Sequence, residues 1–153
     1  TFLLNKKIAY NLRVSKIKDK QAAVEDIDYN TQRKIDMQTL QSLITMDFIR
    51  NHQNIIITGE TGTGKSFISQ ALGTRAIYDG FKVFYIRVPT LLEEIKIARA
   101  DGTYTNLLRK YSKFQLLILD DFGISKMSTD DTTNLFEIIE AKTDVNSIII
   151  TSQ

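Results

Sequence analysis

The feature that most constrains the fold is an eight-residue glycine-rich segment between an apolar, β-branched stretch and a helical pattern. It reads Gly59-Glu60-Thr61-Gly62-Thr63-Gly64-Lys65-Ser66 and matches G-x-x-x-x-G-K-[ST] at every defined position. Residues 54–58 before it favour a strand, and apolar side chains recur at helical spacing over 66–78. The glycines permit positive-φ turns that aim backbone N–H groups at a polyphosphate, beside the positive end of the helix. We therefore expect a phosphate-binding loop between a strand and a helix.

Each part of this loop has an expected role toward ATP and Mg²⁺. The Lys65 ammonium should bridge the β- and γ-phosphates, and the Ser66 hydroxyl should take one position on Mg²⁺. The alternative, an ordinary glycine turn, does not explain the match together with its flanking strand and helix. The predicted nucleotide-binding residues are Gly59, Glu60, Thr61, Gly62, Thr63, Gly64, Lys65, Ser66 and Phe67.

Strand and helix patterns alternate along the rest of the chain. Further strands are predicted over 82–87, 116–120 and 147–151. Helices are predicted over 90–100 with Thr90 as cap, over 103–111, and over 129–141. The last of these should bury Leu135, Phe136, Ile138 and Ile139, and 36–51 shows one buried helical face made of Leu40, Leu43, Ile44 and Phe48. Such alternation predicts an α/β fold with a parallel sheet and helices on both of its faces.

Carboxylates follow the apolar strand at 116–119. In an α/β sheet the ligand crevice lies at the carboxyl ends of the strands, so Asp120 is expected to hold Mg²⁺ and Asp121 to polarise the attacking water. A strand that ends in two Asp residues is a weak signal alone and gains weight beside the phosphate loop. The last strand ends in Thr151-Ser152-Gln153, and the Gln153 amide could contact the γ-phosphate or position water. A simple polar chain end explains these three residues equally well.

Charge is distributed unevenly over the 153 residues. The formal net charge is +2, but residues 1–23 hold six Lys and Arg against one Asp. We expect a basic helical segment over 1–23, a boundary near Val24 and a nucleotide-binding domain over 24–153. The segment could bind DNA phosphates or simply be a solvated helix. The basic residues in question are Lys6, Lys7, Arg13, Lys16, Lys18 and Lys20.

Several classes of protein are excluded by composition. The absence of Cys rules out a disulfide scaffold, a thiolate zinc site and thiol redox chemistry, and it fits a reducing compartment, so we expect a cytoplasmic protein. No apolar run approaches the roughly 20 residues that span a bilayer, so no membrane contact is expected. Residues 1–4 include neither an initiator Met nor a secretory signal, which suggests trimmed ends.

With these motifs placed, the chain resembles the IstB-type transposition helper ATPases, a branch of the AAA+ superfamily close to the DnaC-type helicase loaders. The resemblance runs from about residue 23 to residue 153. Besides the phosphate loop it rests on Val24-Glu25-Asp26-Ile27-Asp28-Tyr29, Arg87-Val88-Pro89-Thr90-Leu91-Leu92-Glu93-Glu94, Ala98-Arg99-Ala100-Asp101-Gly102-Thr103, Leu116-Leu117-Ile118-Leu119-Asp120-Asp121-Phe122-Gly123 and Ile150-Thr151-Ser152-Gln153.

The resemblance implies a P-loop AAA+ core and ATP-dependent assembly of several copies on DNA, followed by recruitment of a transposase. It implies that Gln153 occupies the sensor position where helicase loaders tend to have Asn, and that Asp121 replaces the Glu of most AAA+ ATPases, which suggests slow hydrolysis. A helical lid, a further strand and a trans-acting arginine are expected beyond residue 153. The alternatives are a loader for a replicative helicase and a nucleotide-dependent scaffold with negligible turnover.

Overall fold

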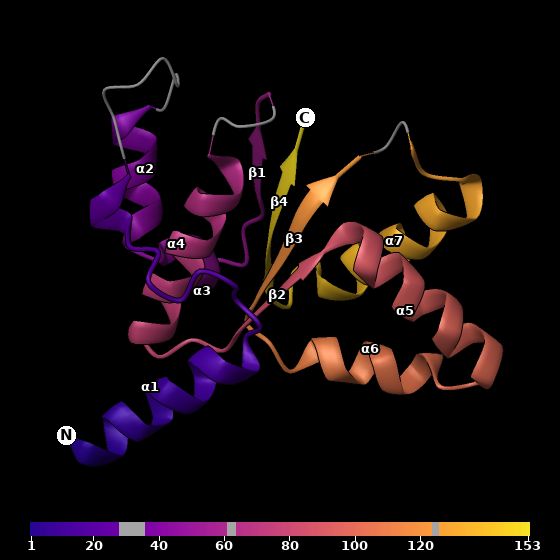
Figure 1. The fold of residues 1–153 in the computed structure, drawn as a ribbon, viewed down its shortest axis with the longest axis horizontal. Coiled ribbons are helices and arrows are strands. Elements are labelled where there is room, and N and C mark those ends of the chain that lie inside the picture. The colour runs from indigo at the N-terminus through magenta and orange to yellow at the C-terminus, as the bar shows by residue number, and fades with distance from the viewer. Residues whose placement is uncertain (28–35, 61–63, 124–125) are drawn as a thin grey trace.

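The computed structural model describes residues 1–27, 36–60, 64–123 and 126–153. Within them lies one sheet of four strands, with the order β1-β4-β3-β2 and parallel pairing between all neighbours (Figure 1). This confirms the predicted α/β fold. The strands are β1 (Ile55–Thr58), β2 (Val83–Arg87), β3 (Leu116–Phe122) and β4 (Ser147–Ser152).

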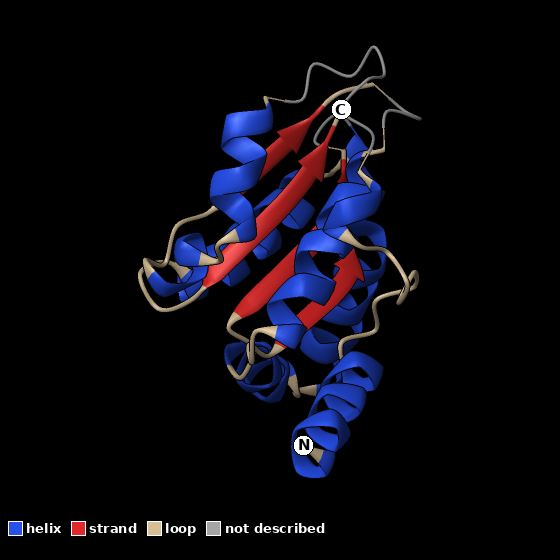
Figure 2. Cartoon of the chain, turned by 90° about the vertical axis from the view of Figure 1, so that its left-hand side faces the viewer, coloured by secondary structure: helices blue, strands red, loops and turns tan. Residues whose placement is uncertain are grey.

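Helices cover both faces of the sheet, as the alternating pattern predicts. Figure 1 shows α2 to α4 on one side of the strands and α5 to α7 on the other, while α1 lies below the ends at which the strands begin. Figure 2 gives the same position for α1. The helices are α1 (Phe2–Val14), η1 (Val24–Asp26), α2 (Met37–Ile44), α3 (Asp47–Arg50), α4 (Lys65–Tyr78), α5 (Val88–Asp101), α6 (Tyr104–Ser112) and α7 (Thr129–Lys142).

Two hydrophobic clusters occupy the two faces because successive strand residues point to opposite sides. In β3, Leu116 and Ile118 belong to the cluster under α4, while Leu117 and Leu119 belong to the cluster under α5 to α7. All four are fully buried. Burial on both sides explains why this strand is a continuous apolar run in the sequence.

Helix α4 packs closely on the sheet at Gly73. A β-carbon at this position would lie 2.7 Å from Ile118 Cδ1 and 3.1 Å from Ile17 Cδ1. The helix also holds the segment that follows α1, because Gln70 Oε1 accepts hydrogen bonds from the backbone N–H groups of Lys18 and Asp19 at 3.0 and 2.9 Å. Helix α4, which starts at the phosphate loop, is therefore fixed from both sides.

Three local expectations need correction. The helical face over 36–51 is divided between α2 and α3, because the buried Met46 takes a left-handed conformation with φ 65°. Helix α5 starts at Val88 with Arg87 as its cap, not at Thr90, since Pro89 is favoured in the first turn. Phe136 is 49% exposed, because the buried side of α7 is formed by Leu135 and Ile138.

The basic N-terminal segment is only partly helical. Helix α1 ends at Val14, so Lys16, Lys18 and Lys20 lie beyond it, and Ile17 and Ala22 join the cluster under α4. The division of the chain at residue 23 stays a prediction. Within the described ranges, no helix has the length and apolar character needed to cross a membrane.

Candidate functional site

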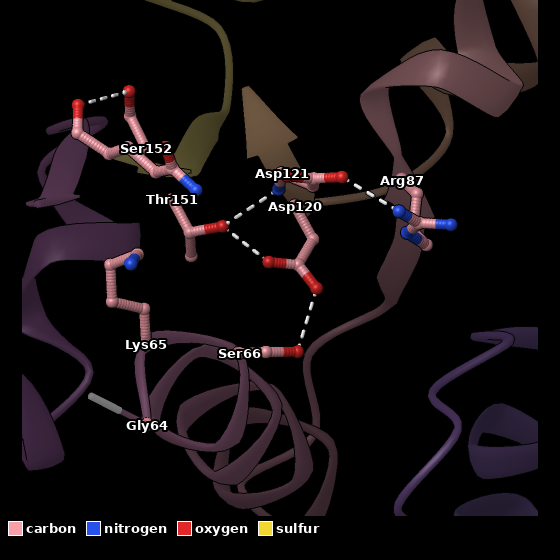
Figure 3. A pocket seen from close by; sticks show the side chains of 9 residues that line it. Gly64, Lys65, Ser66, Arg87, Asp120, Asp121, Thr151 and Ser152 are labelled. Atoms are coloured by element: carbon pink, nitrogen blue, oxygen red, sulfur yellow. Dashed lines mark hydrogen bonds and ion pairs between the residues drawn. The ribbon is translucent and has the colours of Figure 1, made fainter. Parts of the chain in front are cut away.

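A cavity of about 450 Å³ lies at the edge of the sheet where the strands end. Figure 3 shows that its walls come from the start of α4 and from the ends of β2, β3 and β4. The fold therefore brings together residues that are more than 80 positions apart in the sequence. The lining residues are Gly64, Lys65, Ser66, Arg87, Asp120, Asp121, Thr151, Ser152 and Gln153.

The phosphate loop supplies one wall of the cavity. Gly64 has φ 87°, a left-handed conformation that glycine adopts readily, and α4 begins directly after it. The Lys65 ammonium donates hydrogen bonds to the carbonyls of Gly59 and Glu60 at 2.5 and 2.8 Å. The predicted contacts of Thr61, Gly62 and Thr63 lie outside the described residues. The Phe67 side chain is partly buried and packs against the cluster under α4, and its predicted contact with a nucleotide stays a prediction.

Asp120 is held by three hydroxyl groups. Ser66 Oγ donates to Asp120 Oδ2 at 2.7 Å, and the buried Tyr85 and Thr151 hydroxyls also donate to this carboxylate. Burial by itself would raise the pKa of Asp120, but these hydrogen bonds outweigh it and hold the pKa below its ordinary value. The site thus keeps a buried carboxylate ionised.

A β-bulge separates the two adjacent carboxylates. The register between β3 and β4 is irregular between Leu119 and Phe122, and Asp121 has φ 64°. Asp120 consequently stays buried while the Asp121 side chain is half exposed. Asp121 Oδ2 lies 2.7 Å from Arg87 Nη2, so its carboxylate is ion-paired across the cavity mouth (Figure 3).

The end of β4 forms the wall beside these carboxylates. Thr151 Oγ1 accepts a hydrogen bond from the Asp121 N–H at 2.9 Å while its own proton goes to Asp120. Ser152 Oγ donates to the Phe122 carbonyl at 3.1 Å, which ties β4 to β3 beyond the bulge. Gln153 lines the cavity, and its predicted role toward the γ-phosphate stays a prediction.

The oxygen atoms of Ser66 and Asp120 fit a Mg²⁺ ion that completes its shell with phosphate and water oxygens. Mg²⁺ is usually bound by one or two protein oxygens in this way. No group of three or more His, Cys, Asp or Glu side chains suited to a metal occurs in the ranges that the structure describes.

Two site residues were not identified as functional from the sequence. Tyr85 and Arg87 lie on β2, and both contact the carboxylates on β3. The available signal was the position of Arg87 at the end of an apolar strand. This signal could be interpreted only with the strand register, which pairs Arg87 of β2 with Asp120 of β3.

Comparison with known proteins places these residues in a family context. The family described as IstB-like ATP binding protein matches residues 4–153. An insertion sequence ATP-binding protein of Sinorhizobium fredii is 41% identical over 149 residues, covering 97% of this chain and 60% of that protein. A protein of the same description from Pseudomonas fluorescens is 36% identical over 139 residues, covering 91% and 60%. The chain thus spans about 60% of the length of these relatives.

Solved structures share the fold. AMPPCP-bound DnaA from Aquifex aeolicus superposes with a TM-score of 0.75 at 21% identity, covering 86% of this chain and 42% of that one. The DnaC helicase loader gives a TM-score of 0.66 at 19% identity, with coverage of 76% and 67%. At this level of identity the similarity concerns the fold alone, which this chain shares with DnaA and the DnaC helicase loader.

Proposed function

The chain belongs to the family of IstB-like ATP-binding proteins, and on that premise we propose that it is part of an insertion-sequence helper ATPase. In this proposal ATP binding drives assembly of several copies on DNA, and the assembly assists a transposase. The names of the relatives refer to insertion sequences and ATP binding, which supports the proposal that the chain is part of an insertion-sequence protein that binds ATP.

One observation carries the nucleotide chemistry. Ser66, the last residue of the loop motif, lies 2.7 Å from the buried Asp120 at the end of β3. These residues are 54 positions apart in the chain, and they meet in the cavity that also contains Lys65. The cavity thus combines a phosphate-binding helix end with two oxygen ligands for Mg²⁺.

The residues of the cavity have separate tasks in hydrolysis. The loop amides and Lys65 bind the phosphates, and Ser66 and Asp120 hold the ion. Mg²⁺, when bound, neutralises charge on the phosphate oxygens. Asp121 orients the attacking water and accepts its proton. Because Asp121 is paired with Arg87, it must exchange this partner for water before it can act, and slow turnover follows.

The basic N-terminal segment provides the proposed sequence-independent contact with DNA. Its charges are exposed, and α1 contains no acidic residue that would offset them. The six proposed contact residues are Lys6, Lys7, Arg13, Lys16, Lys18 and Lys20. Gln153 is proposed to sense the γ-phosphate and thereby link nucleotide state to assembly.

Calorimetry tests the nucleotide site. The chain should take up ATP with Mg²⁺, and binding should weaken strongly when Mg²⁺ is replaced by EDTA. The Ser66→Ala variant should lose most of this dependence on Mg²⁺, whereas Ser112→Ala, a matched change at the end of α6, should not. Failure of the wild-type chain to bind ATP would contradict the proposal.

A second experiment tests assembly and partner. Sedimentation with duplex DNA should detect larger species with a slowly hydrolysed ATP analogue than with ADP. A pull-down with the transposase of the same insertion sequence should then recover the chain. Recovery of a replicative helicase instead would indicate a loader, and assembly without any hydrolysis would indicate a scaffold.

A further inference from the structure

A second cavity, of about 180 Å³, lies at the opposite edge of the sheet, between α1 and the starts of β2 and β3. Its lining includes Tyr10 and Asn11 from α1, Lys82 before β2, and Lys113 and Phe114 before β3. None of the described residues that line it is acidic. The cavity is thus basic and partly aromatic, and it is separate from the site with the phosphate loop.

Asn11 gives this cavity an unused polar group. The residue is 4% exposed, and its side-chain amide makes no hydrogen bond with any part of the chain that the structure describes. The amide is not among the fully buried polar groups without a partner in the described residues, so it keeps some access to solvent, and its donors and acceptor are available to a ligand. An amide of this kind can pair with the edge of a nucleobase.

Two aromatic residues, Tyr10 and Phe114, line the cavity. Tyr10 is 55% exposed, and the Arg13 guanidinium lies over its ring at 5.3 Å from the centroid. Phe114 is held in place by Phe84, with the two ring centroids 4.9 Å apart. Exposed aromatic rings beside positive charge are the usual platform for the bases of a single strand.

The lysines are attached to a rigid support. The buried Lys142 ammonium donates hydrogen bonds to the carbonyls of Tyr111, at 2.7 Å, and Phe114, which fixes the backbone around Lys113. The Lys82 backbone bonds Gln115 twice, through its N–H at 3.0 Å and its carbonyl at 2.8 Å. The two exposed lysines that line the cavity are therefore attached to a backbone that hydrogen bonds hold in place.

We propose that this cavity binds one unpaired nucleotide of a DNA single strand. The base enters against Tyr10 and is hydrogen-bonded by Asn11, and the phosphates on either side contact Lys82 and Lys113. A base that is stacked and paired within a duplex could not enter a cavity of about 180 Å³, so the site selects unpaired DNA. The choice of DNA rests on the proposed function, which this inference deepens by naming a place and a form of DNA.

The test measures binding of a fluorescent oligo-dT single strand and of a duplex of equal length to the 153-residue chain. The double variant Lys82→Gln/Lys113→Gln should lower the salt slope for the single strand by about 0.7 for each lost phosphate contact. The control is Lys96→Gln/Lys126→Gln, which removes the same charge from two exposed lysines that line neither cavity and are not among the proposed DNA contacts. Equal effects of the two double variants would overturn the proposal.

The aromatic contact is tested separately at Tyr10. Tyr10→Leu should weaken single-strand binding at least about fivefold, because stacking on an aromatic side chain is lost. Tyr10→Phe keeps the ring and should bind as the wild type does. If the leucine variant binds like the phenylalanine variant, no base stacks there and the inference fails.

The base itself is tested with an oligonucleotide that carries abasic sites. We expect the wild-type chain to bind abasic DNA more weakly than the normal strand. The Asn11→Ala variant should bind the two strands equally. Equal affinity of the wild-type chain for both strands would overturn the base pocket. Measurements without nucleotide separate this inference from the proposed ATPase, because loss of ATP binding in Lys65→Ala should leave single-strand binding unchanged.

Discussion

The two edges of the sheet each contain a buried ionisable group, and they treat its charge in opposite ways. At the carboxyl edge, three hydroxyl donors outweigh burial and hold the pKa of Asp120 below its ordinary value. At the amino edge, burial lowers the pKa of Lys142 to about 8, although two carbonyls accept its hydrogen bonds. The carboxyl edge thus favours the charged form of Asp120, as a metal ligand requires, whereas the amino edge disfavours the charged form of Lys142.

The helices explain part of this difference. At the carboxyl edge, α4 directs its positive N-terminal end toward the cavity. At the amino edge, α1, α6 and α7 end with basic side chains in their last turns, where they offset the negative helix end. Basic residues at the amino edge can thus be explained by helix stability alone. The proposed DNA cavity must therefore be tested against control variants that remove the same number of charges elsewhere.

The largest expected effect is at Asp121. Asp121→Asn removes the proposed proton acceptor and should slow ATP hydrolysis by about a hundredfold or more, while ATP binding is retained. Single-turnover hydrolysis and calorimetry measure the two quantities. Asp47→Asn, a change in an exposed ion pair with Arg50, should leave both unchanged. Unaltered hydrolysis in Asp121→Asn would remove Asp121 from the mechanism.

Lys65→Ala should weaken ATP binding by about 1.5 to 3 kcal/mol, because a charge-assisted contact with phosphate is lost. The amino edge should be unaffected, so single-strand DNA binding without nucleotide should match the wild type. Titration with ATP and with oligo-dT measures the two edges independently, and Lys96→Ala on α5 is the control. A loss of both activities would show that the edges are not independent.

Lys142 should give the free energy of unfolding an alkaline dependence. Its pKa is lower in the folded chain than in the unfolded chain, so the unfolded state binds more protons above pH 8 and stability rises with pH. Between pH 8 and 9.5, below the ionisation of unfolded tyrosines, the rise should reach no more than about 2 kcal/mol. Urea unfolding measures it.

Lys142→Met removes the titrating group and should abolish this rise, while Lys110→Met on the surface of α6 should preserve it. The comparison concerns the slope with pH, so it remains informative even if the first variant is less stable overall. A wild-type stability that is flat or falls across this window would mean that the amino edge does not disfavour its buried charge.

The smallest effect is expected at the ion pair that closes the carboxyl edge. Arg87→Ala should change the free energy of unfolding by less than about 1 kcal/mol, because both side chains are half exposed. It should still alter the ATP hydrolysis rate by releasing Asp121. Arg50→Ala, which breaks an exposed pair far from the phosphate loop, should leave the ATP hydrolysis rate unchanged. A hydrolysis rate identical to the wild type would exclude a role for this pair.

Much of the carboxyl edge was predictable because its signals are local. The loop motif, the apolar strand before Asp120 and the alternation of strand and helix each lie within a few residues. The errors concerned the helix over 36–51, the start of α5 at Thr90 and the burial of Phe136. In each case the apolar spacing allowed more than one helix boundary or buried face, and packing decided between them. The contact of Ser66 with Asp120 followed from the rule that ligands bind at the carboxyl ends of parallel strands.

The sequence alone determined the phosphate loop, the kind of sheet and the family resemblance, because these depend on neighbouring residues and their spacing. Only the tertiary structure decided that Tyr85 and Arg87 meet the two carboxylates and that Asn11 lies unpaired beside two lysines. Such contacts depend on strand register, a β-bulge and the path of distant segments, and a pairing across dozens of residues leaves no periodic signal in the chain.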